Sequence, residues 1–228
     1  MPEQRTFEVA LGVFSRHAQS EARPTEFEML GLTWDLLEGV FVPVYTSSTE
    51  LYSAWMPYPA GGSFLEVGCG AGVTAVLAAL RGCRSVTALD VAAAAVSNTR
   101  RNAERHGVGD RVRVLQSDMF AGLDADDRFD VIFWNSNYAE APADFVYETE
   151  LQQAFFDAGY RSHRAYVSGA RAHLADGGRG LLGFGNVGNR PLLDELAAEA
   201  GLRVRLLQHA SRTTTVTMDY QLLELAPS

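Results

Sequence analysis

The sequence contains no lysine, and its cysteines and long apolar runs are also scarce. The sequence has 19 arginines and 28 acidic residues, so the formal net charge is −9 at pH 7. A protein that binds duplex nucleic acid normally carries clustered positive charge that displaces counterions. We therefore do not expect nucleic acid as a partner. The two cysteines, Cys69 and Cys83, show no paired ligand spacing, which argues against a disulfide framework and a structural metal site.

No apolar stretch approaches the roughly 20 residues that a membrane-spanning helix needs, and the first 24 residues lack the apolar core of a signal peptide. These absences predict a soluble, cytoplasmic protein without a membrane partner. What the chain does have is 228 residues with 47% hydrophobic composition, enough for one large core. The oligomeric state is left open, with a homodimer as one option.

The first 60 residues predict an appendage to the main domain, made of a helix, a hairpin and a second helix. Residues 5–20 carry apolar side chains at helical spacing, so this helix either packs on the core, which we prefer, or forms a lid over a ligand site. Residues 27–43 alternate and contain two glycines, which predicts a hairpin. A polar loop then enters a helix ending near residue 58, with Ser48 or Thr49 as N-cap.

The rest of the chain, residues 61–228, predicts a doubly wound, Rossmann-like α/β domain, because continuous apolar strands that alternate with helices are typical of a parallel sheet covered on both faces. The final apolar run, residues 213–226, has no helix before it and should pair antiparallel as a terminal hairpin. The preceding strands are expected over 63–68, 85–90, 111–118, 129–137, 178–187 and 203–209, with helices over 73–81, 92–106, 161–174 and 191–200.

A glycine-rich turn follows the first of these strands. Gly68, Gly70 and Gly72 let the backbone turn tightly and approach a ligand, and the next helix offers unpaired N–H groups at its start. Val73 stands where a dinucleotide-binding fingerprint has its third glycine. The acidic Glu66 just before the turn would repel a pyrophosphate, so a cationic ligand fits better.

Acidic residues also end the next two strands. Asp90 lies 18 residues beyond Gly72, where a carboxylate can accept hydrogen bonds from both hydroxyls of a ribose. Asp118 is placed to bind an adenine amino group, and Met119 offers the ring an apolar contact.

This combination resembles the class I S-adenosylmethionine (SAM) dependent methyltransferases over roughly residues 60–226. The resemblance implies a seven-stranded sheet with an antiparallel terminal strand, and SAM as the cofactor lying across the strand ends. It implies cofactor contacts from Glu66, Gly68, Cys69, Gly70, Gly72, Asp90, Val91, Asp118, Met119 and Asn135.

The segment after the fourth strand, Trp134-Asn135-Ser136-Asn137-Tyr138, is similar to the Asn-Pro-Pro-Tyr motif of HemK-like and other amino-methylating enzymes. In that motif the Asn side chain and a carbonyl accept hydrogen bonds from a planar amino group. Both prolines are replaced here, which changes how rigidly the acceptors are held. By this resemblance Asn135, Asn137 and Tyr138 are the candidate catalytic residues.

A long, aromatic connection follows, over residues 139–163, and such connections generally shape a second-substrate pocket. His163 could act there as a base, although a histidine that begins a helix is more often a cap or surface residue, and we prefer that interpretation. The core and the site are equally good environments for Trp134. The candidate pocket residues are Tyr45, Thr49, Trp134, Tyr147, Tyr160 and His163, with Phe156 beside them.

These residues favour methyl transfer from SAM to a nitrogen or oxygen of a small metabolite. One alternative is a SAM cyclase, in which the α-amine of SAM displaces methylthioadenosine to form azetidine-2-carboxylate, as in faintly similar enzymes of this fold. A nucleic-acid or protein amino-methyltransferase and a SAM-binding protein without activity remain further alternatives.

Overall fold

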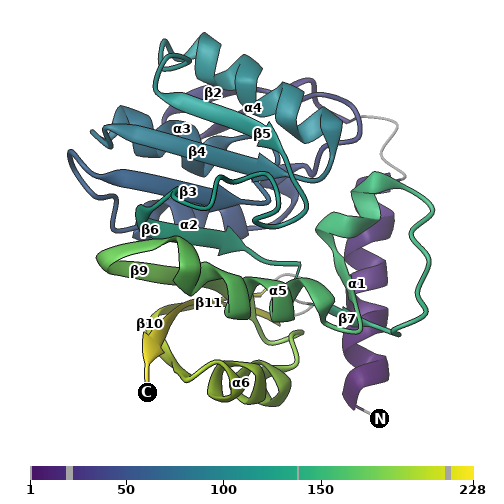
Figure 1. Ribbon diagram of the computed structural model, residues 1–228. Helices are drawn as coiled ribbons and strands as arrows, with labels where there is room; N and C mark the ends of the chain where they lie inside the picture. The colour runs from purple at the N-terminus through teal and green to yellow at the C-terminus, as the bar shows by residue number, and fades with distance from the viewer. Residues whose placement is uncertain (1, 19–22, 138, 214–216) are drawn as a thin grey trace.

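A seven-stranded mixed sheet forms the centre of the computed structural model, which describes residues 2–18, 23–137, 139–213 and 217–228 (Figure 1). Its strands are β3 (Ser63–Val67), β4 (Ser85–Asp90), β5 (Val112–Gln116), β6 (Phe129–Asn135), β9 (Leu174–Gly185), β10 (Leu202–Thr213) and β11 (Thr217–Pro227). The spatial order is β10-β11-β9-β6-β3-β4-β5, and β11 runs antiparallel to both of its neighbours. The expected Rossmann-like fold with an antiparallel terminal hairpin is confirmed.

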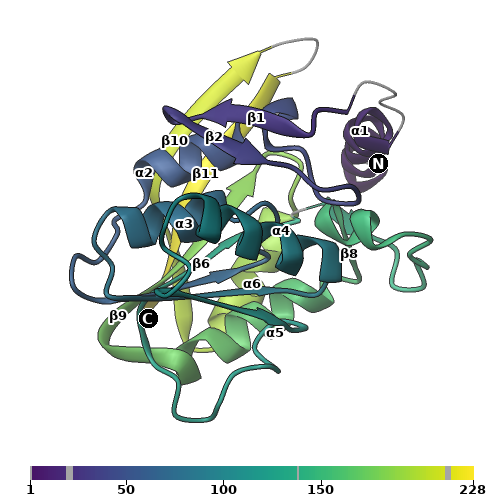
Figure 2. The ribbon, with the colours of Figure 1, turned by 90° about the horizontal axis from the view of Figure 1, so that it is seen from above.

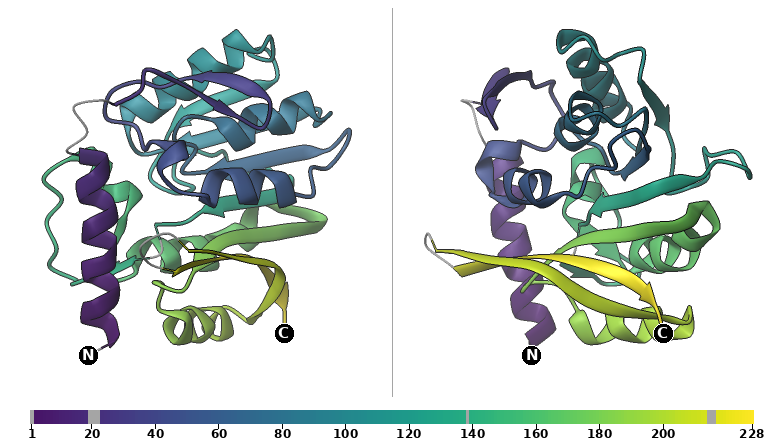
Figure 3. Two further views of the ribbon diagram at one scale, coloured as in Figure 1. Left: turned by 180° about the vertical axis from the view of Figure 1, so that it is seen from behind. Right: turned by 90° about the vertical axis from the view of Figure 1, so that its left-hand side faces the viewer.

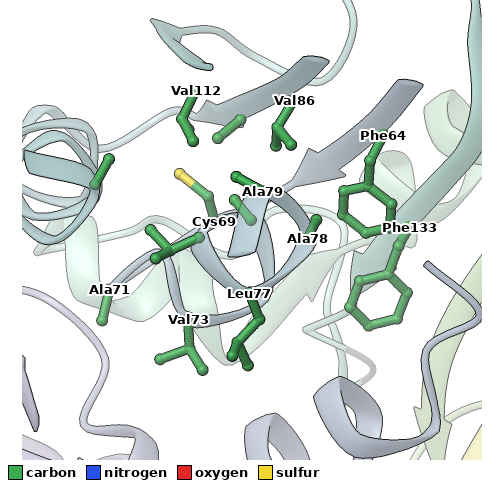
Figure 4. Close-up of a cluster of buried hydrophobic side chains, with 14 of the residues drawn as sticks. Phe64, Cys69, Ala71, Val73, Leu77, Ala78, Ala79, Val86, Val112 and Phe133 are labelled. Carbon is green, nitrogen blue, oxygen red and sulfur yellow. The ribbon is translucent and has the colours of Figure 1, made fainter. Parts of the chain in front are cut away.

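Helices cover both faces of this sheet. Neighbouring residues of one strand belong to different cores: Phe64 packs with α3 (Val73–Leu80), whereas Leu65 packs with α5 (Arg161–Gly169) and α6 (Arg190–Glu199). The first of these cores also takes in α2 (Ser48–Trp55) and α4 (Ala93–Arg105), and Figure 4 shows side chains of α3 packed beside Phe64 and Phe133. Burial on both faces explains why the strands read as continuous apolar runs.

The N-terminal appendage consists of α1 (Pro2–Ala18), a hairpin of β1 (Glu26–Met29) and β2 (Leu32–Asp35), and the 3-10 turn η1 (Pro43–Tyr45). Figure 2 shows the hairpin on the side of the sheet that carries α2, α3 and α4. The amides of Asn98 and Asn102 on α4 bind its backbone at Asp35. The hairpin is shorter than the expected 27–43, because the chain leaves the ladder at Asp35.

The start of α2 also differs from its expectation. Ser48 is already the first helical residue, and Ser47 holds the N-cap position without a side-chain hydrogen bond to the helix. Neither Ser48 nor Thr49 is therefore the N-cap.

Within the connection between β6 and α5, residues 139–158 form an insert that the sequence did not indicate. It consists of a small parallel sheet, β7 (Ala139–Ala141) with β8 (Phe156–Ala158), and of the 3-10 turn η2 (Glu150–Ala154) between them. Helix α1 packs on this insert, with the rings of Phe7 and Phe14 against Phe156. Figures 1 and 3 show α1 standing beside the insert at one end of the sheet. After α5 the chain continues as the 3-10 turn η3 (Ala170–His173).

Within the described ranges, none of the helices combines the length and the apolar character that a bilayer crossing requires.

Candidate active site

A cavity of about 640 Å³ lies at the carboxyl ends of β3, β4, β5 and β6, where ligands bind in doubly wound sheets. This volume falls in the range of cofactor and small-molecule pockets. Side chains of α1, of segment 39–50, of the insert and of the β10–β11 hairpin complete its walls. Most sequence-predicted site residues line the cavity: Glu66, Gly68, Cys69, Gly70, Asp90, Val91, Asp118, Met119 and Asn135 of the cofactor set, and Tyr45, Thr49, Trp134, Asn137 and Tyr147 of the others.

The glycine-rich turn provides one end of the cavity. Gly70 has a φ of +53° and no atom within 4 Å of the place where a Cβ would stand, so the backbone is open to a ligand there. Gly72 was expected to contact the cofactor, but it is not among the lining residues. Its φ is +80°, and a Cβ would stand 2.8 Å from the Thr99 side chain. Gly72 therefore lets the turn pack closely against α4.

Asp90 is fixed by two backbone donors. The Gly70 N–H donates to Oδ2 at 2.9 Å, and the Ala92 N–H donates to Oδ1 at 3.0 Å. Burial raises the pKa of the Asp90 carboxyl, and these hydrogen bonds oppose that shift. Each oxygen keeps capacity for another hydrogen bond, so the carboxylate suits a vicinal diol.

The adenine-side candidates lie just past a strand. The structure ends β5 at Gln116, two residues before Asp118, which therefore belongs to a turn rather than to the strand end. Met119 in this turn has a φ of +47°, in the left-handed region.

Glu66 does not act as an exposed anion beside the turn. Its side chain is buried, and one carboxyl oxygen accepts the Ala75 N–H at 2.8 Å, near the start of α3. Burial raises the pKa of Glu66 to about 8, against an ordinary value of 4.5. The carboxyl is therefore largely protonated at neutral pH, and the argument that its charge selects a cationic ligand is wrong.

The segment that ends β6 presents four described residues, and Tyr138 lies outside the described ranges. Asn137 donates both hydrogens of its amide to the insert, to the carbonyls of Gln153 and Phe156 at 2.8 Å each. These bonds fix the amide orientation, so Oδ1 points the other way. That oxygen is buried and has no hydrogen-bond partner. Asn137 therefore holds the insert while keeping one unpaired acceptor.

His163 is the largest departure from expectation. It is neither a surface residue nor a cap, since its side chain is 0% exposed, and it does not itself line the cavity. Its Nδ1 lies 2.7 Å from Asp157 Oδ2, and its Nε2 lies 3.2 Å from the hydroxyl of Ser136, which does line the cavity. The expected pocket residue Tyr160 is instead stacked on the His163 ring at 4.1 Å.

The other aromatic candidates divide between cavity and core. Tyr147 lines the cavity, and its hydroxyl donates to the Phe156 carbonyl and accepts from the Ala158 N–H. The Phe156 side chain packs under α1, outside the cavity lining. Trp134 serves both environments, because it lines the cavity and its ring packs on His163 at 4.8 Å.

Sequence reasoning missed Ser136 and Asp157. Ser136 was noted only as a replaced proline, although a hydroxyl at a strand end is itself a signal. Asp157 stands six residues before His163, a spacing that indicates contact only when the chain turns sharply, as it does at Gly159 and Tyr160 with φ of +60° and +54°.

Comparisons with known proteins agree with this architecture. Residues 64–156 match the family model described as "Methyltransferase domain". The ribosomal protein uL3 glutamine methyltransferase of Burkholderia pseudomallei is 33% identical over 138 residues, which are 55% of this chain and 45% of that protein. The release factor glutamine methyltransferase of Bordetella pertussis is 36% identical over 115 residues, 49% of this chain and 42% of that protein.

The chain spans less than half the length of these two curated relatives. A solved structure agrees over more of the chain: a methyltransferase from Pyrococcus furiosus superposes with a TM-score of 0.62 at 19% identity, over 97% of this chain and 98% of that one. This likeness shows that the two chains share the fold from end to end.

Proposed function

Because residues 64–156 match a methyltransferase domain, we propose that this chain is a class I SAM-dependent methyltransferase, which transfers the methyl group of SAM to a nitrogen or oxygen of a small molecule held in the cavity. One observation carries the proposal. A single cavity reaches from the strand ends that suit a nucleoside to walls that the chain builds from α1 and the insert. Both reactants would thus lie inside one enclosure.

The strand-end half of the cavity suits SAM. Asp90 would accept the ribose hydroxyls, and Asp118 with Met119 would contact the adenine. The open backbone at Gly70 would pass beside the methionine part. Trp134 offers an aromatic face for the sulfonium cation, a contact worth about 0.5–2 kcal/mol in proteins. Since the sulfonium is already a leaving group, the main requirement is alignment of the attacking atom.

The other half supports a small acceptor rather than a protein side chain. The two relatives are named for methylation of glutamine, whose planar amide the Asn-Pro-Pro-Tyr motif of HemK-like enzymes holds. Here Ser136 and Asn137 replace the prolines, and the Asn137 amide hydrogens bind the insert. Residues of α1, among them Val13 and Arg16, also line the cavity, and we assign them to the acceptor side.

Calorimetry with SAM and with S-adenosylhomocysteine tests cofactor binding. Turnover is then measured with SAM and a panel of phenols, primary amines and a glutamine-containing peptide, and the adenosyl products are identified by mass spectrometry. We expect binding of both nucleosides, and S-adenosylhomocysteine formation with a phenol or amine. Absence of SAM binding would refute the proposal, and methylation of the peptide alone would replace the small acceptor with a protein. Methylthioadenosine formed from SAM alone would identify the cyclase.

A further inference from the structure

Behind the cavity wall, Ser136, His163 and Asp157 form a continuous hydrogen-bonded chain. The Asp157 carboxylate accepts the backbone N–H groups of Ser162 and His163 at 2.9 Å each, and its Oδ2 lies 2.7 Å from His163 Nδ1. Because an ionised carboxylate only accepts hydrogen bonds, Nδ1 must carry a proton. His163 Nε2 then faces the Ser136 hydroxyl at 3.2 Å.

This row of three hydrogen-bonded side chains is buried, except at the end that reaches the cavity. The Asp157 and His163 side chains are 1% and 0% exposed, and Ser136 lines the cavity. The rings of Trp134, Tyr160 and Phe184 pack around the imidazole at 4.1–6.0 Å between centroids. Any proton that reaches His163 from a bound molecule therefore passes through the Ser136 hydroxyl.

The geometry accommodates both the neutral and the protonated imidazole of His163 without movement of a heavy atom. The Ser136 hydroxyl also lies 2.7 Å from the Gly183 carbonyl oxygen. With a neutral imidazole, the hydroxyl hydrogen can be donated to Nε2. With an imidazolium, Nε2–H donates to the Ser136 oxygen and the hydroxyl donates to the Gly183 carbonyl. In both states every polar atom of the Ser136, His163 and Asp157 side chains has a hydrogen-bond partner. An added proton therefore requires only rotation of the Ser136 hydroxyl.

We propose that Ser136, His163 and Asp157 are a proton relay that removes the proton from the attacking nitrogen or oxygen of the acceptor, an inference that rests on the proposed methyl transfer. Ser136 contacts the acceptor, and His163 and Asp157 act through it. The relay selects acceptors that must lose a proton, such as phenols, alcohols and ammonium groups.

The proposed step balances in atoms and charge. The acceptor oxygen or nitrogen forms a bond to the methyl carbon as the carbon–sulfur bond of the sulfonium breaks, and the electron pair of that bond stays on sulfur. The acceptor proton moves to the Ser136 oxygen while the Ser136 hydroxyl proton moves to His163 Nε2. Asp157 stabilises the resulting imidazolium, which returns its proton to water once the products have left.

Nuclear magnetic resonance of protein with ¹⁵N-labelled histidine tests the relay without SAM or acceptor. The Ser136→Ala variant removes the hydroxyl, His163→Gln identifies the signal, and Ser168→Ala on the exposed side of α5 is the matched control. At mildly alkaline pH we expect a protonated Nδ1 and an unprotonated Nε2 whose resonance shifts in Ser136→Ala only. A tautomer protonated at Nε2, or an Nε2 signal that Ser136→Ala leaves unchanged, would overturn the relay. Loss of SAM binding, by contrast, would refute only the methyl transfer.

Turnover provides the second measurement, with the phenol or amine that the wild type methylates. Ser136→Ala should lower kcat by about 10²–10⁴-fold and leave the KM for SAM unchanged. Its rate should keep rising with pH until the acceptor ionises by itself, whereas the wild-type rate should level off earlier. The titratable groups that touch the imidazole, Asp157 and Tyr160, are intact in this variant. A lower kcat with an unchanged pH profile would indicate a structural role and contradict the proposal.

Discussion

At the scale of single residues, two carboxyls lie beside the same glycine-rich turn, and burial raises the pKa of both, that of Glu66 to about 8. Asp90 receives two backbone N–H groups that favour its ionised form. Glu66 receives one backbone N–H, from Ala75, and its side chain is buried. The sequence placed both residues at the site, since each stands next to the turn. It could not predict how burial changes the pKa of each carboxyl, because that depends on how the surrounding elements pack.

Asp90→Asn should weaken SAM binding about 10–100-fold, because hydrogen bonds to a charged group contribute about 1.5–3 kcal/mol. Calorimetry with SAM measures this change. Asp110→Asn, which alters an exposed acid away from the cavity, is the control with the same change of charge. Equal affinities of the two variants would exclude Asp90 from ribose binding.

Glu66 should make stability depend on pH. The folded-state pKa is raised from 4.5 to about 8, so its contribution is complete below pH 4.5 and is lost as pH rises towards 8, because the unfolded chain ionises first. Glu66→Gln keeps an acceptor for the Ala75 N–H and removes the ionisation. Denaturant unfolding across this range should show the wild type losing stability relative to the variant. Parallel pH curves for the two proteins would contradict the prediction.

Gly72→Ala should destabilise the protein by more than the ordinary strain of a positive φ, about 1–2 kcal/mol, because the new Cβ would also meet the Thr99 backbone at 2.9 Å. Gly107→Ala is a matched control, since that glycine has a φ of +67° and open space around the Cβ position. The free energies of unfolding of both variants measure the difference. Equal losses in the free energy of unfolding would mean that α4 shifts to make room for the added methyl group.

At the scale of elements, predictability followed strand length. The strands of the main sheet were evident because burial on both faces demands continuous apolar runs. Strands β7 and β8 have three residues each, too few for a periodic signal, and they pair because the Asn137 amide and the α1 rings hold the insert in place. For the same reason the Ser136–His163–Asp157 contact could not be derived from the sequence.

Helix α1 does what both interpretations of its sequence predict, since its apolar face packs on the insert and its side chains also line the cavity. Val9, Ala10 and Val13 of α1 line the cavity. His17 near its end stacks on Phe41 at 4.7 Å between ring centroids. The contact between the helix and the cavity wall therefore includes a titratable ring.

Acid should loosen α1. Burial lowers the pKa of His17 below its ordinary 6.5, so docking is fully stable above that pH and weakens as pH falls, because the undocked helix takes up a proton more readily. His17→Phe preserves an aromatic ring and removes the titration. Hydrogen exchange of residues 2–18 at about pH 5 and about pH 8, expressed relative to this variant, measures the effect. A ratio that does not change with pH would refute the coupling.

At the scale of the whole molecule, the walls of the cavity come from the first helix, from four strand ends in the middle of the chain, and from Met218 and Tyr220 in β11. A ligand there should tie these distant segments together. Binding that favours the native state alone raises stability by RT ln(1 + [L]/Kd), about 2.7 kcal/mol at a hundredfold excess over Kd.

Saturating S-adenosylhomocysteine should therefore raise the unfolding temperature by several degrees, in line with about 2.7 kcal/mol for a chain of this size. It should also slow hydrogen exchange at the strand ends that carry Gly70 and Asp90. The Asp90→Asn variant serves as the weak-binding control. Protection confined to α1, with the strand ends unchanged, would place the ligand elsewhere.

The contribution of Tyr220 to the wall also has a consequence for biosynthesis. During translation α1 leaves the ribosome before the strands of the sheet, and domains generally fold as they emerge. The cavity lacks the wall that contains Tyr220 until the hairpin of β10 and β11 has been translated and β11 has paired with β9. Nascent chains stalled before residue 213 should thus fail to retain a radiolabelled nucleoside, even though every strand-end carboxylate has already been synthesised.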